Sequence, residues 1–144
     1  DFAETGDFRV LVKPKINPDL SNYFVELTGI TQERMDAEGL AFSEALAAFH
    51  GFIGDGVSAV YSFGGDEKHL YLNCGLHGMS CPINMRLFRD IMPLFQNVLG
   101  LGPQPIVTAQ LPELLGFEAP GKTHNALDDA RCVAEALRVL DGRS

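Results

Sequence analysis

The chain has 144 residues, of which 46% are hydrophobic and 21% are charged, a composition that suits one globular domain with a single core. No apolar run approaches the roughly 18 residues that a membrane-spanning helix needs, so we expect no membrane partner. The net charge of -8 excludes broad, sequence-independent coating of nucleic acid but is compatible with an acidic pocket that holds cations.

Hydrophobic periodicity predicts two strands and several helices. In chain order we expect a strand over 8–13 after a turn, helices over 20–28 and 43–53, a strand over 57–63, helices over 66–78, 85–98 and 110–115, and a last helix over 125–140. Ser43 should cap the second helix, and Gly64-Gly65 should turn the chain from a strand into a helix. This order predicts one α/β domain over residues 1–144, with a mixed sheet flanked by helices.

The cysteines predict the compartment. Cys74, Cys81 and Cys132 are odd in number and show no paired spacing. This argues against a disulfide framework and for a reducing compartment, so we expect a cytoplasmic protein. His69, Cys74, His77 and Cys81 are close enough in sequence to suggest a zinc site, but their spacing matches no familiar zinc pattern.

A second group of candidate residues follows the strand over 57–63. The stretch Ser62-Phe-Gly-Gly-Asp-Glu-Lys-His-Leu70 places acids where a strand ends and a helix begins, and open α/β sheets bind ligands at the carboxyl ends of their strands. Asp66 shares a helical face with Leu70 and is expected to point inward, whereas Glu67 stays the alternative. Without a ligand, this would be an ordinary negatively charged helix start.

The last helix carries two adjacent aspartates in its first turn. Asn125 is its expected N-cap, and Asp128 the expected capping-box partner. The expected buried stripe of this helix consists of Ala126, Ala130, Val133, Ala134 and Leu137. Asp129 lies at the flank of that stripe, where a carboxylate pairs with a cation or binds a metal. His124 precedes the helix, and its ring can turn into the cleft beside Asp129.

Six stretches in order resemble the DEDDh 3′–5′ exonucleases. This group includes ribonuclease T, the proofreading subunit of bacterial DNA polymerase, and the histone-mRNA and small-RNA exonucleases. The stretches are Leu11–Pro14, Pro18–Phe24, Leu27–Thr31, Phe42–Leu46, Ser62–Leu70 and His124–Ala130. Together they cover nearly the whole chain, from about Phe8 to Leu140.

The resemblance implies a ribonuclease H-like fold and hydrolysis of phosphodiester bonds at single-stranded RNA or DNA 3′ ends. In the family, four carboxylates hold two divalent ions, Mg²⁺ or Mn²⁺. Residue by residue, Asp66 matches the middle acid and Asp129 the last acid, both as metal ligands, and His124 matches the general base. The family's middle acid often stands one residue further from the glycine, which keeps Glu67 as the alternative.

The family's first motif, an Asp-x-Glu on the first strand, supplies the other two carboxylates. Asp1 and Glu4 stand near the expected place, but they are three residues apart and would point to opposite faces of a strand. The distance to Leu11–Pro14 is also shorter than in the family. We therefore expect the first strand and two ligands to lie upstream of Asp1, so that this chain is truncated and binds its second ion poorly.

Two function classes follow from these observations. The first is a metal-dependent 3′–5′ exonuclease. The alternative is a non-catalytic exonuclease-like module that binds nucleic acid or a protein partner. An Asp-x-Glu strand upstream of Asp1 would distinguish the two.

Overall fold

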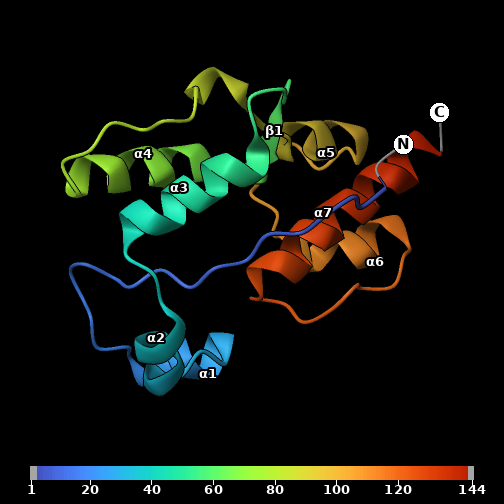
Figure 1. Cartoon of the computed structure of the whole chain (residues 1–144). Helices are drawn as coiled ribbons and strands as arrows, with labels where there is room; N and C mark the ends of the chain where they lie inside the picture. The colour runs from blue at the N-terminus through green and yellow to red at the C-terminus, as the bar shows by residue number, and fades with distance from the viewer. Residues whose placement is uncertain (1–2, 143–144) are drawn as a thin grey trace.

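The structure is a computed structural model in which residues 3–142 are described, and these form helices around a short sheet (Figure 1). In chain order the elements are α1 (Asn22–Thr28), α2 (Gln32–Glu38), α3 (Phe42–Ile53), β1 (Val60–Ser62), α4 (Asp66–Leu76), the 3₁₀ helix η1 (Met85–Leu87), β2 (Phe88–Asp90), α5 (Met92–Val98), the 3₁₀ helix η2 (Thr108–Gln110), α6 (Leu111–Leu115) and α7 (Ala126–Asp141). No helix in this range has the length and apolar character of a membrane span.

The sheet consists, within residues 3–142, of β1 and β2 paired in parallel. Val60 lies opposite Phe88 and Ser62 opposite Asp90, and the Ile91 amide donates to the Ser62 carbonyl over 2.9 Å. Parallel neighbours need a crossover connection, and the segment containing α4 supplies it. The carboxyl ends of both strands therefore lie at the same edge of the sheet. The segment with Asp66 and Glu67 starts from this edge.

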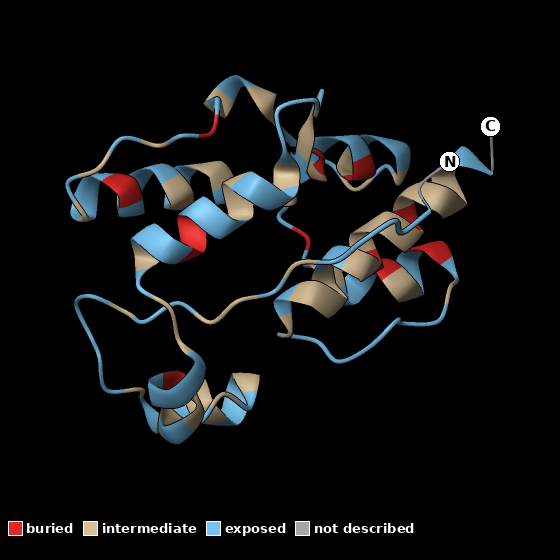
Figure 2. Ribbon diagram, viewed as in Figure 1, coloured by how far each residue is buried: buried red, intermediate tan, exposed pale blue. Residues whose placement is uncertain are grey.

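Helices α1 and α2 lie apart from the sheet in Figure 1. The other helices pack around the sheet in two groups, each with its own hydrophobic cluster (Figure 2). In the first group, Leu46 of α3 and Cys74 of α4 are buried, and Phe88 of β2 packs against them. In the second group, α5, α6 and α7 surround the fully buried Phe95, and Phe63 packs there directly after β1. The sheet thus contributes residues to both clusters, as expected for an α/β domain.

Local sequence signals located several helices correctly. Gly29 ends α1 in the left-handed conformation, with φ 70°, as predicted. Gly65 precedes α4 with φ 91°, and Asn125 caps α7 through its side chain. Ser43 is not a cap, because α3 begins one residue earlier, with Ala41 as its N-cap and the Glu44 side chain accepting from the Ala41 amide. Helix α2 was not predicted.

The predicted strand over 8–13 does not form. Val12 makes one isolated parallel bridge with Leu40, and Phe8 packs against Phe52 of α3 with ring centroids 5.4 Å apart. The residues ahead of it, expected as a turn, also lack regular secondary structure. An alternating pattern becomes a strand only where a neighbour takes its backbone hydrogen bonds, and the described residues offer this segment a single bridge.

The predicted helix over 85–98 is also wrong, because this stretch contains η1, β2 and α5. The backbone of Phe88–Asp90 pairs with β1 instead of continuing a helix. The predicted strand over 57–63 does form, as β1, but it is shorter than predicted and covers only Val60–Ser62. Pro93 stands in the first turn of α5, where its missing N–H costs nothing.

The buried face of α7 differs from the predicted stripe. Cys132 and Ala136 are buried, whereas Ala126 and Ala130 are exposed. Both η2 and α6 pack against α7 and cover the face that Cys132 occupies. An alanine-rich helix has several faces that could be buried, so the neighbouring elements decide which one is.

Candidate functional site

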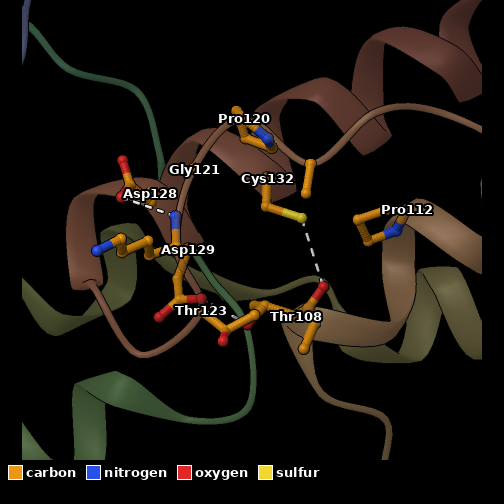
Figure 3. A pocket seen from close by; sticks show the side chains of 11 residues that line it. Thr108, Pro112, Pro120, Gly121, Thr123, Asp128, Asp129 and Cys132 are labelled. Atoms are coloured by element: carbon orange, nitrogen blue, oxygen red, sulfur yellow. Dashed lines mark hydrogen bonds between the residues drawn. The ribbon is translucent and has the colours of Figure 1, made fainter. Parts of the chain in front are cut away.

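Asp129 is held in the first turn of α7 by a hydrogen bond to η2. The hydroxyl of Thr108 donates to Asp129 Oδ1 over 3.0 Å, and the Cys132 thiol donates to the Thr108 carbonyl over 3.4 Å (Figure 3). Burial raises the pKa of the Cys132 thiol, and the nearby Asp129 carboxylate raises it further, so the thiol stays protonated as a donor. The half-buried Asp129 therefore has a defined orientation, which a ligand or catalytic carboxylate requires.

A small pocket lies between the loop that precedes α7 and the η2–α6 segment, with about 260 Å³ of empty space that opens to solvent. Figure 3 shows its lining, which is Thr108, Ala109, Pro112, Ala119, Pro120, Gly121, Lys122, Thr123, Asp128, Asp129 and Cys132. Both aspartates in the first turn of α7 thus line one pocket. His124 and the acids after β1 are not in this lining.

His124 has an unusual backbone conformation. Its φ is 64°, and among the described residues it is the one non-glycine with a positive φ. A residue with a side chain adopts this region at some cost, and such conformations are common where the surroundings hold a functional residue in place. The His124 side chain is exposed, so its ring is accessible to a substrate.

Asp128 has a different role from the one predicted. Its Oδ2 accepts a hydrogen bond from the Lys122 amide over 3.1 Å, which joins α7 to the loop ahead of it rather than closing a capping box. Its Oδ1 lies 3.8 Å from a guanidinium nitrogen of Arg131. The cap itself comes from Asn125, whose side chain accepts from the Leu127 amide over 3.3 Å.

Arg131 binds the N-terminal segment, which runs alongside α7 in Figure 1. Its guanidinium donates to both carboxylate oxygens of Glu4, at 2.8 Å and 3.1 Å, and pairs with Asp7 at 3.4 Å. The hydrogen bond from Arg131 lowers the pKa of the Glu4 carboxyl. Glu4 is therefore neutralised by a cation of this chain, which disfavours it as a metal ligand, and Asp1 lies outside the described residues.

The two acids after β1 differ in orientation. Asp66 is exposed, so the expectation that it points inward is not met. Glu67 is half-buried, and its Oε2 accepts from the hydroxyl of the buried Ser62 over 3.4 Å. Gly65 is the N-cap of α4 and adopts φ 91°, a conformation that glycine reaches at little cost, and Glu67 is the acid of the first turn that lies against the strand.

Two residues of this region were missed in the sequence. Asp90 is the last residue of β2, and its Oδ1 accepts from the Gly64 amide at 2.9 Å and the Met92 amide at 3.0 Å, which ties the ends of both strands together. Pro93 was the available signal, because a proline there indicates a helix start just after Asp90. Thr108, the partner of Asp129, had no sequence signal.

The described residues do not complete a metal centre. No three His, Cys, Asp or Glu side chains in residues 3–142 gather closely enough to hold an ion. The zinc alternative gains no support from these residues, and the His77 ring stacks on Phe42 with ring centroids 4.7 Å apart. The oxygen donors of Asp129 and of Glu67 or Asp66 suit Mg²⁺ and Mn²⁺ chemically, but they supply only part of a two-ion site.

The family model described as exonuclease (RNase T) matches residues 1–137. The 3′–5′ exoribonuclease 1 of Homo sapiens is 28% identical over 142 residues, which cover 92% of this chain and 40% of that protein. The corresponding Rattus norvegicus protein is 27% identical, with 92% and 41% covered. This chain therefore spans about two fifths of the length of the curated relatives it matches.

Two solved structures share the fold. The nuclease domain of 3′hExo, a DEDDh family member bound to rAMP, has a TM-score of 0.81 and 26% identity, covering 96% of this chain and 74% of that one. A 3′-exonuclease that recognises the histone mRNA stem-loop has a TM-score of 0.85 and 22% identity, covering 98% and 52%. The predicted fold class is confirmed.

Proposed function

The chain belongs to the exonuclease (RNase T) family and resembles its DEDDh members, and on this basis we propose that it is the nuclease part of a metal-dependent 3′–5′ exonuclease. The observation that carries the proposal is the half-buried Asp129, oriented by Thr108 and preceded by the strained backbone of His124. These are the residues that match the family's last acid and general base. The substrate would be the single-stranded 3′ end of a nucleic acid.

RNA is the first substrate to test. The matched relatives are exoribonucleases, and the matched structures contain rAMP or recognise an mRNA stem-loop. The acidic balance of the chain, with a net charge of -8, favours a substrate held through cations rather than through many lysines and arginines. A cytoplasmic location stays a prediction from cysteine usage.

Each residue of the proposed site has one task. His124 would take the proton of the attacking water, because imidazole can accept a proton near neutral pH. Asp129 and one acid after β1 would hold divalent ions, which when bound neutralise charge on the phosphodiester.

The first test is metal removal. A 5′-labelled single-stranded RNA incubated with this chain and Mn²⁺ should shorten from its 3′ end. Excess EDTA should stop the shortening, because carboxylates without their cations are negatively charged and cannot stabilise the charge on the phosphate. Denaturing gels over time provide the measurement, and DNA of the same sequence reports the sugar preference. Shortening that persists in EDTA would refute metal dependence.

A non-catalytic module remains the second candidate function, because the described residues bring no three ligating side chains together. The same assay separates the two. RNA that stays intact with Mn²⁺ but is retarded by the chain in a native gel would favour a binding module. RNA that shortens would exclude it.

The acid after β1 can be identified by a pair of matched variants. We expect Glu67→Gln to slow RNA shortening by about 10- to 100-fold, since Glu67 faces Ser62 and the strand. Asp66→Asn should change the rate by less than about threefold, because the Asp66 side chain faces solvent. Initial rates at saturating Mn²⁺ measure both effects. The reverse ranking would assign the role to Asp66, as the sequence first favoured.

A further inference from the structure

The loop that carries His124 is joined to α7 by the carboxylate of Asp128. Asp128 Oδ2 accepts the Lys122 amide hydrogen over 3.1 Å, two residues before His124 (Figure 3). The same carboxylate packs directly on Gly121. A Cβ added at Gly121 would lie 2.6 Å from Asp128 Oδ2, so the backbone of the loop and this side chain fit together without spare room.

Asp128 is itself restrained. Its side chain is 21% exposed, and Arg131, one turn later on α7, lies 3.8 Å from its second oxygen. Arg131 in turn is held by hydrogen bonds to both carboxylate oxygens of Glu4 and by an ion pair to Asp7. A carboxylate fixed by a neighbouring guanidinium can hold a backbone amide in one place, whereas a free side chain would exchange among rotamers.

The loop is therefore fastened on both sides of His124. Asp128 holds it at Lys122, and Asn125 holds it at the helix start, where its side chain accepts from the Leu127 amide. Between these two points His124 adopts φ 64°, a conformation that a side-chain-bearing residue keeps only when its surroundings impose it. Without the bond to Asp128, the backbone at His124 would relax.

We infer that Asp128 is a positioning residue for His124, which acts by holding residues 121–124 against α7. The inference rests on the proposed function, because it assigns His124 the task of accepting the proton. Asp128 does not touch the reacting atoms in this account. Its effect comes from geometry, since a displacement of about 1 Å in a catalytic group can cost on the order of 100-fold in rate.

The first experiment measures the loop directly and needs no activity. In Asp128→Ala, the Lys122 amide should exchange with solvent about 3- to 10-fold faster than in the wild-type chain, because its acceptor is gone. In Asp128→Asn, which keeps an oxygen acceptor and the shape that packs on Gly121, exchange should stay close to the wild-type rate. Equal exchange in all three proteins would refute the bond that the inference requires.

The second experiment is a double-mutant cycle on RNA shortening. His124→Ala should lower kcat by about 100- to 10,000-fold. Asp128→Ala should lower kcat by about 10- to 100-fold with the KM for RNA unchanged, and Asp128→Asn should restore most of this loss. If Asp128 acts through His124, the double variant should be no slower than His124→Ala alone, within about threefold.

Each outcome decides one statement. Losses that multiply in the double variant would overturn the positioning role, because Asp128 would then act independently of His124. A kcat of Asp128→Asn as low as that of Asp128→Ala, with Lys122 amide exchange still at the wild-type rate, would also overturn it, since the charge of Asp128 rather than the placement of the loop would then matter. A wild-type chain that retards RNA in a native gel without shortening it would favour the non-catalytic module over the proposed function, while amide exchange would still decide whether Asp128 holds the loop.

Discussion

Asp129→Asn should reduce the rate of RNA shortening by more than about 100-fold. Changing a residue that only hydrogen-bonds to a metal ligand costs about 10- to 100-fold, so the loss of a ligand itself should be larger. Asparagine has nearly the same shape and can still accept the hydrogen bond that Thr108 donates over 3.0 Å. It lacks the negative charge that attracts a divalent cation. The loss should therefore appear in activity and in cation affinity while the fold is kept.

The measurement for Asp129 has two parts. Single-turnover rates at increasing Mn²⁺ report activity, and calorimetric titration with Mn²⁺ in the absence of RNA reports binding. Glu118→Gln is the matched control, because Glu118 is an exposed acid in the loop after α6. A rate for Asp129→Asn within about threefold of this control would contradict a role for Asp129 in holding metal.

Phe95→Ala should cost about 3–5 kcal/mol of the free energy of unfolding, the usual range for removing a buried aromatic ring. Phe95 of α5 is 0% exposed, and its ring lies 5.7 Å from that of Phe63, which follows β1. The ring thus fills the space between the sheet and the α5–α7 group of helices. Because a domain of this kind is stable by only about 5–15 kcal/mol, much of the stability would be lost.

Urea unfolding followed by circular dichroism checks this expectation. Leu94→Ala is the control, since Leu94 is the neighbouring residue on α5 but is 46% exposed, and it should cost less than about 1 kcal/mol. The midpoint should shift without a change in the slope m. If the two variants unfolded at the same urea concentration, the hydrophobic cluster around Phe95 would not be a stabilising core of the domain.

Several features could be read from the sequence because short-range interactions decide them. Gly29 ends α1 because a residue without a Cβ adopts a left-handed φ at little cost. Asn125 starts α7 because its side chain reaches an amide two residues away. The fold class followed from the order of motifs, and the structural likenesses confirmed it.

The strands could not be placed in the same way. Phe88–Asp90 lies in a stretch with helical spacing, but its backbone pairs with β1, which is more than twenty residues earlier in the chain. Residues 8–13 alternate as a strand should, but they find one bridge partner, at Leu40. A strand is completed by hydrogen bonds to another strand, so periodicity alone does not decide whether it forms.

The candidate site shows the same division between local and tertiary information. The sequence by itself determined that His124 and Asp129 stand at the start of a helix and that two acids follow a strand. Tertiary structure alone decided that Thr108 orients Asp129, that Glu67 rather than Asp66 turns toward Ser62, and that Asp128 binds the loop. Side-chain partners come from elements distant in sequence, and a local pattern carries no information about which of them will be close.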